Sequence, residues 1–454
     1  MSSVEKFSNL AKNATLGRFV VLQRKPPTDI GIGGPRPPAS PLFHPDTISR
    51  SVPSIILARI SGLDGPGITA GLMEVLAQGD CALYDVEQVV LRDRLSLSVL
   101  ISVPEGQPTV RDVLFYAWEK GLQADFEVVD EGAPTPVKPR FAVTVIGAEI
   151  TPDAFGAVAT AIASAGGNID SIERLSRYPV VSYELAVSGG DQAAMRSSLL
   201  VTSAAHNVDV AVQAEGLTRR SKRLVVLDVD STLIQDEAID LLADAAGVGP
   251  EVASLTAQAM AGEIDFAEAL NRRVGLLRGL SVEALEGVWE KLRLTPGAKT
   301  FVRTLRRMGM KIAIVSGGFT VFTDRLKADL DLDHAFGNEL EIVDGKLTGR
   351  LSRPPIDRAR KAAILKEVAA SEGIPLDQTV AIGDGANDLD MLAAAGLGIA
   401  FNAKAVVRDA ADTAVSVPFL DAILFLLGIR REEVEAADGG DGGVPIPVAG
   451  LPPM

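Results

Sequence analysis

The sequence predicts an α/β protein in which a doubly wound parallel sheet carries an inserted helical segment and is preceded by two small α+β domains. Three observations predict this fold class. From about residue 222 onward, short apolar strands alternate with helical patterns. A largely helical stretch at about 236–295 interrupts that alternation after its first strand. Upstream, residues 54–215 hold two similar units, each a strand, a turn, a helix and further strands.

The composition is that of a globular protein without basic character. The chain has 454 residues, of which 47% are hydrophobic and 23% charged. Its 44 basic and 59 acidic side chains give a net charge of −15, which argues against a nucleic-acid or anionic-membrane partner. No apolar run is long enough to span a membrane and no secretory signal is visible, so we expect a cytoplasmic protein. The single cysteine, Cys81, excludes an intramolecular disulfide and a cysteine-based zinc site.

Composition and pattern also predict the division of the chain. The two ends are rich in Pro and Gly, and the C-terminal one is acidic as well, so we expect both to be irregular. The predicted segments are a Pro-rich flexible arm at 1–52, a first α+β domain at 53–132, a second at 139–218, the parallel-sheet domain at 222–430 with its helical insertion at about 236–295, and a disordered tail at 431–454.

The two N-terminal units indicate a duplication. The first begins SIILARISGLDGPGI and the second RFAVTVIGAEITPD, and Gly62 and Gly147 occupy matching strand ends. The spacing of about 85 residues drifts only slightly afterwards, as expected of a duplicated domain. Exposed sheet edges in such small domains favour pairing between chains, so we expect a homo-oligomer, in the simplest case a homodimer.

The stretch LVVLDVDSTLI, residues 224–234, ends a buried strand in two aspartates, Asp228 and Asp230. Side chains alternate along a strand, so both carboxylates leave its end on the same side. Two neighbouring carboxylates in a partly dry environment raise a pKa or require a cation. The structural alternative is an aspartate that caps the following helix beside a solvated neighbour.

Two further motifs follow predicted strands. Ser316 and Gly317 come directly after KIAIV, and GDGAND, with Asp384 and Asp388, comes after TVAI. In an open parallel sheet, ligands bind at the carboxyl ends of the strands, so these motifs should meet Asp228 there. Hydroxyl and backbone N–H groups suit phosphate oxygens, and carboxylates from separate loops suit Mg²⁺. Taken singly, the first motif also fits a simple turn and the second a solvated acidic loop.

A phosphate among these carboxylates needs more positive charge than one Mg²⁺ supplies. The helical pattern DRARKAAILKEVAASEG offers candidate cations. Lys361 is one of them, although its position alone does not select it over Lys366 or Arg360.

Taken together, DVDST, VSGG, Lys361 and GDGAND resemble, in order and spacing, the motif set of the haloacid dehalogenase superfamily of aspartyl phosphatases, whose fold is Rossmann-like. The inserted helices resemble the cap of that superfamily. Within it, QDEAIDLLA, MAGEIDFAEALNRRVGLLRG and GDGANDLDML are similar to the phosphoserine phosphatase family, and the likeness runs from about 222 to 428.

The two N-terminal units resemble ACT domains, ferredoxin-like modules that bind ligands in amino-acid metabolism. GLDGPGI, residues 62–68, matches their ligand-binding turn. The second unit has GAEITPD in place of the Gly-Pro-Gly, so the resemblance to that turn is confined to the first unit.

The resemblance implies an Mg²⁺-dependent enzyme that hydrolyses O-phospho-L-serine in the last step of serine synthesis. Asp228 would be the nucleophile that forms an aspartyl-phosphate, and Asp230 the general acid and base. Mg²⁺ would be held by the side chains of Asp228 and Asp384 and by the backbone carbonyl of Asp230. The implied substrate-binding residues are Glu237, Met260, Phe266, Arg273, Ser316, Gly317, Lys361 and Asn387. The ACT pair implies regulation by L-serine, bound near Gly62 and Asp64.

Two other functions stay open. Glu237 and Arg273 suit other zwitterions, so the substrate of a phosphatase could be another small phosphomonoester. A non-catalytic, amino-acid-sensing protein with an Mg²⁺-binding switch is the second alternative. The presence of Asp230 beside Asp228 argues against it, because a protein without turnover has no chemical need for both carboxylates.

Overall fold

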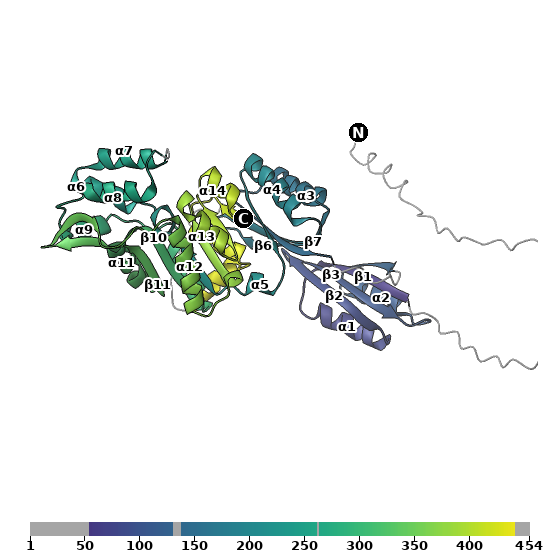
Figure 1. Ribbon diagram of the computed structural model, residues 1–454. Coiled ribbons are helices and arrows are strands. Elements are labelled where there is room, and N and C mark those ends of the chain that lie inside the picture. The colour runs from purple at the N-terminus through teal and green to yellow at the C-terminus, as the bar shows by residue number, and fades with distance from the viewer. Residues whose placement is uncertain (1–53, 130–137, 261–262, 441–454) are drawn as a thin grey trace, which may run out of the picture. The chain divides into compact units, whose positions relative to one another are not determined.

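The computed structural model describes residues 54–129, 138–260 and 263–440 (Figure 1). The chain divides into two compact units, Met1–Thr135 and Pro136–Met454, and each is described by itself. The arm predicted at 1–52 lies outside the described residues, as do residues 441–454 of the predicted tail. Within the described ranges, no helix combines the length and the apolar character needed to cross a membrane.

The first unit is an antiparallel sheet with two helices packed over it. Its strand order is β2-β3-β1-β4, and Leu72, Leu97 and Val113 lie in its core. The prediction covered the first four elements and omitted the last two. The elements are β1 (Ser54–Leu63), α1 (Ile68–Gln78), β2 (Ala82–Leu91), β3 (Arg94–Val103), α2 (Thr109–Glu119) and β4 (Gln123–Val129).

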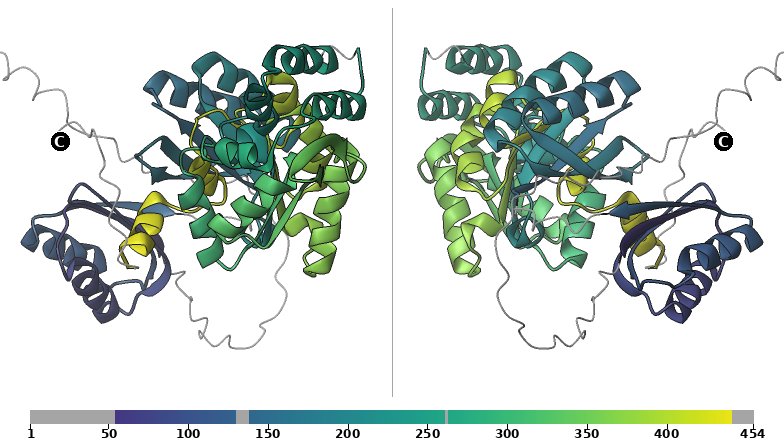
Figure 2. Two further views of the ribbon diagram at one scale, coloured as in Figure 1. Left: turned by 90° about the vertical axis from the view of Figure 1, so that its left-hand side faces the viewer. Right: turned by 90° about the vertical axis from the view of Figure 1, so that its right-hand side faces the viewer.

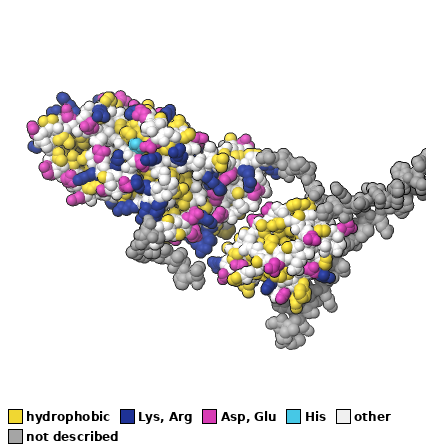
Figure 3. Space-filling view, turned by 90° about the horizontal axis from the view of Figure 1, so that it is seen from below, with side chains coloured by type: hydrophobic (Ala, Val, Ile, Leu, Met, Phe, Trp, Pro, Cys, Tyr) yellow, Lys and Arg dark blue, Asp and Glu magenta, His cyan; other side chains and the backbone are white. Residues whose placement is uncertain are grey.

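Strand β2 is one of the two edge strands of this first sheet. All ten of its residues are exposed, and large apolar side chains such as Tyr84, Val89 and Leu91 are among them. On the face of the molecule seen in Figure 3, hydrophobic side chains gather on the surface of the smaller unit. The exposed strand therefore has the apolar character and the free backbone groups that favour association.

The second unit begins with a domain of the same design. Its strand order, β6-β7-β5-β8, matches that of the first domain position by position, as a duplication requires. Thr151 and Asp191 are the N-caps of its two helices. The Thr151 side chain accepts a hydrogen bond from the Ala154 N–H, and the Asp191 side chain accepts one from the Ala194 N–H. The elements are β5 (Arg140–Gly147), α3 (Pro152–Ser164), β6 (Gly167–Ser176), β7 (Val181–Gly189), α4 (Gln192–His206) and β8 (Asp209–Ala214).

This second domain shares a hydrophobic core with the parallel-sheet domain that follows it. Ile146 and Leu175 belong to the same buried cluster as Phe425 near the C-terminal end. At the junction, the Ser416 N–H donates to Asp209 Oδ2 at 2.6 Å. The two domains are joined by the short helix α5 (Leu217–Arg220).

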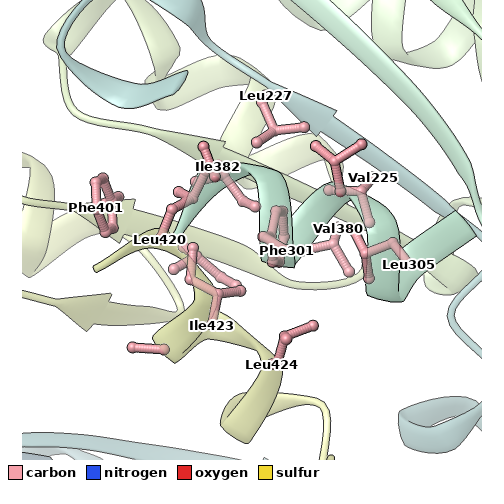
Figure 4. Close-up of a cluster of buried hydrophobic side chains, with 14 of the residues drawn as sticks. Val225, Leu227, Phe301, Leu305, Val380, Ile382, Phe401, Leu420, Ile423 and Leu424 are labelled. Atoms are coloured by element: carbon pink, nitrogen blue, oxygen red, sulfur yellow. The ribbon is translucent and has the colours of Figure 1, made fainter. Parts of the chain in front are cut away.

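The parallel sheet has the order β11-β10-β9-β14-β15-β16, which confirms the predicted doubly wound fold. Strand β9 lies at its centre, where all four of its side chains are buried. Figure 4 shows Val225 and Leu227 of β9 and Val380 and Ile382 of β14 packed with apolar side chains of α10 and the C-terminal segment. The strands are β9 (Leu224–Leu227), β10 (Lys311–Phe319), β11 (His334–Asn338), β14 (Thr379–Gly383), β15 (Gly398–Phe401) and β16 (Thr413–Val415).

Helices and short turns connect these strands. The helices are α10 (Ala298–Arg307), α11 (Thr320–Leu330), α12 (Arg358–Ser371), α13 (Leu389–Ala394), α14 (Ala405–Ala410), α15 (Ile423–Leu426) and α16 (Arg431–Gly440). The helical turns are η1 (Val229–Leu233), η2 (Leu376–Gln378), η3 (Ala386–Asp388) and η4 (Leu420–Ala422).

The cap is inserted after β9, and its core, in which Leu242, Val252 and Leu270 are buried, also includes Phe319 of β10 and Phe322 of α11. Helices α6, α7 and α8 lie together as one group in both sets of views (Figures 1 and 2). The cap helices are α6 (Ala238–Ala246), α7 (Gly249–Met260), α8 (Phe266–Leu276) and α9 (Val282–Trp289). The predicted hairpin is present as β12 (Leu340–Val343) and β13 (Lys346–Leu351).

The prediction of a disordered tail from residue 431 is wrong for residues 431–440, which form α16. Arg431 pairs with the buried Asp421 at 2.8 Å and with Glu435 one turn later at 2.9 Å. Val434 is buried against the core. The acidic composition therefore reflects the solvated face of a docked helix.

Candidate active site

Asp228 and Asp230 lie where the central strand β9 ends. The Asp228 N–H donates to the Ile382 carbonyl of β14 at 2.8 Å, which fixes the strand end. The Asp228 side chain is 6% exposed and accepts a hydrogen bond from the Val229 N–H at 2.7 Å. Ser231 adopts a left-handed conformation with φ 55°, so the chain turns sharply after Asp230.

Lys361 reaches the same point from α12. Asp357 caps this helix by accepting a hydrogen bond from the Arg360 N–H. The Lys361 side chain is fully buried, and its Nζ lies 2.8 Å from Asp228 Oδ1 and 2.7 Å from Asp388 Oδ1. The structure thus selects Lys361 from the cations of this helix, since Lys366 is exposed and Arg360 pairs with Glu367.

Burial and charge act together on these groups. Burial and the neighbouring Asp388 raise the pKa of Asp228, against the opposing effect of Lys361. Burial alone would lower the pKa of Lys361, but Asp228 and Asp388 outweigh it and raise that pKa. Burial and Asp388 raise the pKa of Asp384 to about 6. One ammonium group therefore faces three carboxylates.

These three carboxylates, of Asp228, Asp384 and Asp388, bring oxygen atoms within 4.8 Å of one another. Such a set of oxygens from separate loops fits a hard divalent cation. Asp384 accepts a hydrogen bond from the Thr232 hydroxyl at 3.3 Å. Sequence reasoning named Asp388 with Asp384 among the carboxylates that suit Mg²⁺, but the metal ligands implied by the resemblance did not include Asp388.

The first glycine of GDGAND, Gly383, is required by this packing. A Cβ atom at Gly383 would lie 2.4 Å from the Asp388 Cγ, so only glycine lets the buried carboxylate approach the strand end.

Asp230 lies beside this group and points toward the cap. Its Oδ1 accepts from the Ala238 N–H at the start of α6, and its Oδ2 accepts from the Ser316 hydroxyl, both at 2.8 Å. A Cβ atom at Gly318 would lie 2.9 Å from both Asp230 Oδ2 and Ser316 Oγ. The expected role of Asp230 in metal binding concerned its backbone carbonyl, whereas its carboxylate is held by these donors.

Ser316 and Gly317 lie within β10, on the same edge of the sheet as Asp228. Ser316 is 1% exposed, and its Oγ accepts a hydrogen bond from the Gly318 N–H at 2.6 Å. Asn338, which sequence reasoning missed, donates to the Gly317 carbonyl at 2.8 Å. Asn338 is buried at the end of β11, and a polar residue at a strand end was the only signal in the sequence.

The cap presents Glu237 and Arg273 near this edge. Glu237 Oε1 accepts a hydrogen bond from the Ser231 hydroxyl at 2.8 Å. Desolvation and the neighbouring Asp230 raise the pKa of Glu237 to about 7, although the residue is exposed and solvent screens part of this effect. Arg273 donates to Thr256 at 3.4 Å, and its buried Nε has no hydrogen-bond partner among the described residues.

The other predicted substrate contacts differ in how well they are placed. A Cβ atom at Gly317 would lie 3.4 Å from Phe266 Cζ, so this aromatic ring of the cap faces the Ser316-Gly317 segment. Met260 is the last residue of α7, and its side chain lies outside the described part of the chain. Asn387 belongs to η3, in the same loop as Asp384 and Asp388.

The predicted regulatory residues lie in the first unit. Gly62 is closely packed, because a Cβ atom there would lie 2.5 Å from Leu122 Cδ2 and 3.3 Å from Leu122 Cα. Asp64 is exposed, and its N–H donates to the Asp93 carbonyl at 2.9 Å. A ligand-binding role for this turn stays a prediction.

The site combines three features: the buried Asp228 paired with Lys361, the carboxylate of Asp230 outside that ion pair, and the Ser316 hydroxyl followed by two glycines. This combination suits nucleophilic displacement at phosphorus. Residues 225–393 match the model of the haloacid dehalogenase-like hydrolases. Residues 54–127 and 140–213 each match an ACT domain model. Fold and site therefore define a haloacid dehalogenase-like hydrolase with two ACT domains.

Similar proteins narrow the class. The phosphoserine phosphatase of Streptomyces coelicolor is 52% identical over 394 residues, which cover 86% of this chain and 96% of that protein. The phosphoserine phosphatase SerB2 of Mycobacterium tuberculosis is 49% identical, covering 86% of this chain and 97% of that protein. This chain belongs to the phosphoserine phosphatase family.

Solved structures agree with this assignment. A crystal structure of a probable phosphoserine phosphatase from Vibrio cholerae is 36% identical, with a TM-score of 0.52, and the match covers 69% of this chain and 91% of that one. A hydrolase of the haloacid dehalogenase family from Salmonella enterica serovar Typhi is 30% identical with a TM-score of 0.57, covering 63% of this chain and 98% of that one.

Proposed function

We propose that this enzyme hydrolyses O-phospho-L-serine to L-serine and phosphate, with Mg²⁺ as cofactor and through an aspartyl-phosphate on Asp228. The observation that carries the proposal is the buried contact of Lys361 with both Asp228 and Asp388, beside Asp384 and Ser316. The activity named for the relatives supports the choice of substrate.

The first step assigns different tasks to the two aspartates. An Asp228 oxygen attacks phosphorus, and the bond between phosphorus and the serine oxygen breaks. Asp230 gives its proton to that leaving oxygen. Its hydrogen bonds to Ala238 and Ser316 hold its carboxyl group on the cap side of Asp228.

In the second step, water attacks the phosphorus of the aspartyl-phosphate. Asp230, now ionised, takes a proton from that water, and the bond to the Asp228 oxygen breaks to release phosphate. Lys361, the Ser316 hydroxyl and the Gly317 N–H bind phosphate oxygens, where negative charge develops in both steps.

The side chains of Asp228, Asp384 and Asp388 fit a bound Mg²⁺, to which the backbone carbonyl of Asp230 would add a ligand. When bound, Mg²⁺ supplies positive charge that offsets the carboxylates and the phosphate. Asn387, in the loop that carries Asp384 and Asp388, would contact the substrate or orient Asp384.

The cap would recognise the amino-acid part of the substrate. Arg273 has a buried Nε without a partner among the described residues, and its Nη1 contact is long, so its guanidinium is available to a carboxylate. Glu237 would pair with the substrate ammonium. Phe266, which faces Gly317, and Met260 would form the apolar wall of the closed site.

The ACT domains suggest that an amino acid regulates the enzyme, and we take L-serine, bound near Gly62 and Asp64, as that regulator. Its effect requires two states of the protein with different serine affinities. We further propose a homo-oligomer, in the simplest case a homodimer, formed through the ACT domains, for which the exposed apolar edge strand β2 is the support.

A panel of phosphomonoesters, assayed on the purified chain with and without Mg²⁺, tests the main proposal. We expect phosphate release from O-phospho-L-serine that requires Mg²⁺ and exceeds release from the other esters. Preference for another ester would favour the alternative phosphatase, and no turnover of any ester would favour the non-catalytic alternative. The cytoplasmic location predicted from the sequence stays a prediction.

A further inference from the structure

A groove outside the candidate active site runs along α10 and α11. It consists of two adjoining hollows of about 530 and 580 Å³, which share Lys299, Asp329 and Leu330. The first hollow has an apolar wall that includes Trp289, Leu294 and Leu326. The second is bordered by basic side chains of α10, Arg303, Arg306 and Arg307. We call these two hollows the α10–α11 groove.

Helix α16 ends at this groove. Its Asp438 pairs with Arg303 and, at 2.5 Å, with Arg307, and both arginines line the second hollow. The helix ends at Gly440, two residues beyond Asp438. The chain that follows α16 therefore starts beside the second hollow.

The residues that follow, DGGVPIPVAGLPPM at 441–454, are mostly apolar, like the wall that Trp289, Leu294 and Leu326 form in the first hollow. They include five large apolar side chains, at Val444, Ile446, Val448, Leu451 and Met454, and four prolines. Beyond Asp441 they carry no charged side chain, so they can lie beside both Lys299 and Asp329 without like-charge repulsion. Pro-rich apolar segments bind grooves with an aromatic wall at a low cost in ordering entropy.

The distances allow this placement. Eight residues of α10 separate Arg307 from Lys299, which corresponds to about 12 Å along a helix axis. An extended Pro-rich chain covers about 3.1 Å per residue, so roughly four extended residues span that length.

We propose that residues 441–454 of this chain occupy the α10–α11 groove and place their apolar side chains against Trp289, Leu294 and Leu330. The groove spans two parts of the domain, because Trp289 belongs to the cap helix α9 whereas Leu330 belongs to α11. The bound segment thus links the cap to the body of the domain.

The groove also touches the two connections between cap and body. Ile234 and Leu294, which both line the first hollow, pair with each other in an isolated bridge. Beside them, the Gln235 N–H donates to the Arg293 carbonyl and the Thr295 N–H to the Leu233 carbonyl. A segment bound here stabilises these hydrogen bonds and slows their opening.

Tryptophan fluorescence tests the proposal without reference to activity. The chain has two tryptophans, so Trp118→Phe leaves Trp289 as the sole reporter. We compare this variant as the full chain and as a chain ended after Gly440. Acrylamide quenching of Trp289 should rise about twofold in the shortened chain, since a bound apolar segment keeps water and quencher from the indole. A synthetic peptide of residues 441–454 should restore protection, and a scrambled peptide should not.

A full-length variant separates docking from a general effect of truncation. In the double variant Ile446→Asp, Leu451→Asp, acrylamide should quench Trp289 as strongly as it does in the shortened chain. In the matched control Asp441→Asn, Trp289 should be quenched as weakly as in the full chain. Hydrogen exchange at the Gln235 and Thr295 amides should be faster in the first variant than in the control.

Three results would overturn the proposal. One is equal quenching of the full and shortened chains. Another is peptide 441–454 failing to protect Trp289 in the shortened chain. The third is protection that appears only as protein concentration rises, which would make a second copy the occupant.

Discussion

Lys361 Nζ lies 2.8 Å from Asp228 Oδ1, and both side chains are almost completely buried. The same ammonium group contacts Asp388 at 2.7 Å. It therefore joins the end of β9, helix α12 and the loop after β14 at one point. An ion pair at this depth persists only because each charge is compensated by the other.

Replacing Lys361 should consequently lower stability as well as activity. In Lys361→Met, Asp228 and Asp388 remain buried without their cation, and we expect a loss of about 3–5 kcal/mol in the free energy of unfolding. Mg²⁺ should restore part of this loss, because it supplies positive charge to the same carboxylates. Thermal melts with Mg²⁺ and with a chelator measure both effects. The control is Lys366→Met on the exposed face of α12, and equal melting temperatures for the two variants would contradict the prediction.

Variants of the two aspartates at the end of β9 should be blocked at different steps of the reaction. Asp228→Asn removes the nucleophile with little change of volume, and turnover of every phosphomonoester should fall by about 10⁴-fold or more while the fold is kept. Asp230→Asn removes the proton donor, so phosphorylation by an ester with an acidic leaving group, such as p-nitrophenyl phosphate, should survive better than phosphorylation by O-phospho-L-serine.

Trapped phosphoenzyme gives the decisive measurement for this pair. Asp230→Asn should accumulate phosphate on the protein after p-nitrophenyl phosphate is added, because the second step also needs Asp230. Asp228→Asn should accumulate none. Near-wild-type turnover of Asp228→Asn would remove it as the nucleophile.

Arg273 should determine specificity for the substrate carboxylate. Arg273→Ala should reduce kcat/KM for O-phospho-L-serine by about 10²-fold or more, the effect of losing a charged hydrogen-bond pair. An ester without a carboxylate, such as O-phosphoethanolamine, should be affected far less. The neighbouring Arg272→Ala is the matched control, since Arg272 is exposed and pairs with Glu268. Equal losses on both substrates would show that Arg273 acts on the fold or the phosphate instead.

Serine regulation should depend on the first ACT domain. We expect L-serine to change the activity of the full chain. In Asp64→Ala, the serine concentration needed for half of that change should rise about tenfold. Glu149→Ala is the control, because Glu149 occupies the matching position after Gly147 in the turn that lacks Gly-Pro-Gly. Activity that is constant across a wide serine titration of the unmodified chain would refute the regulatory role.

The sequence predicted the fold wherever a local pattern determined it. Strand β9 is a short, uninterrupted apolar run ending in Asp228, and such runs identify buried parallel strands without knowledge of their neighbours. The placement of Asp228, Asp384 and Ser316 at one edge followed from the rule that carboxyl ends of parallel strands coincide.

The features of the fold and site that the sequence did not predict depend on contacts between segments far apart in the chain. Lys361 could be distinguished from Arg360 and Lys366 only once α12 was packed on the sheet. The helical period of the sequence does not determine which of these side chains faces the carboxylates. Helix α16 was missed because its stability depends on the pairing of Arg431 with Asp421 and on the burial of Val434. The shared core of the second ACT domain and the parallel-sheet domain has no local signal, since each contributes residues that also suit a core of its own.

That shared core contains a titratable group whose effect on stability can be measured. Asp209 is 8% exposed where β8 meets the segment after β16, and it accepts a hydrogen bond from the Ser416 N–H at 2.6 Å. Burial raises the pKa of Asp209 above its ordinary value, against the lowering effect of Ser416 and Arg408.

A carboxyl group with a raised pKa in the folded protein binds more protons there than in the unfolded chain. Its contribution therefore makes stability fall as pH rises from the unfolded pKa through the folded one. Asp209→Asn keeps an oxygen that can accept from Ser416 and removes the titration. Its melting temperature relative to the unmodified chain should rise as pH increases from about 4 to neutrality. Asp412→Asn serves as the control, because Asp412 is exposed and immediately precedes β16. A difference between Asp209→Asn and the unmodified chain that does not change with pH would mean that Asp209 is ionised to the same extent in the folded and unfolded states.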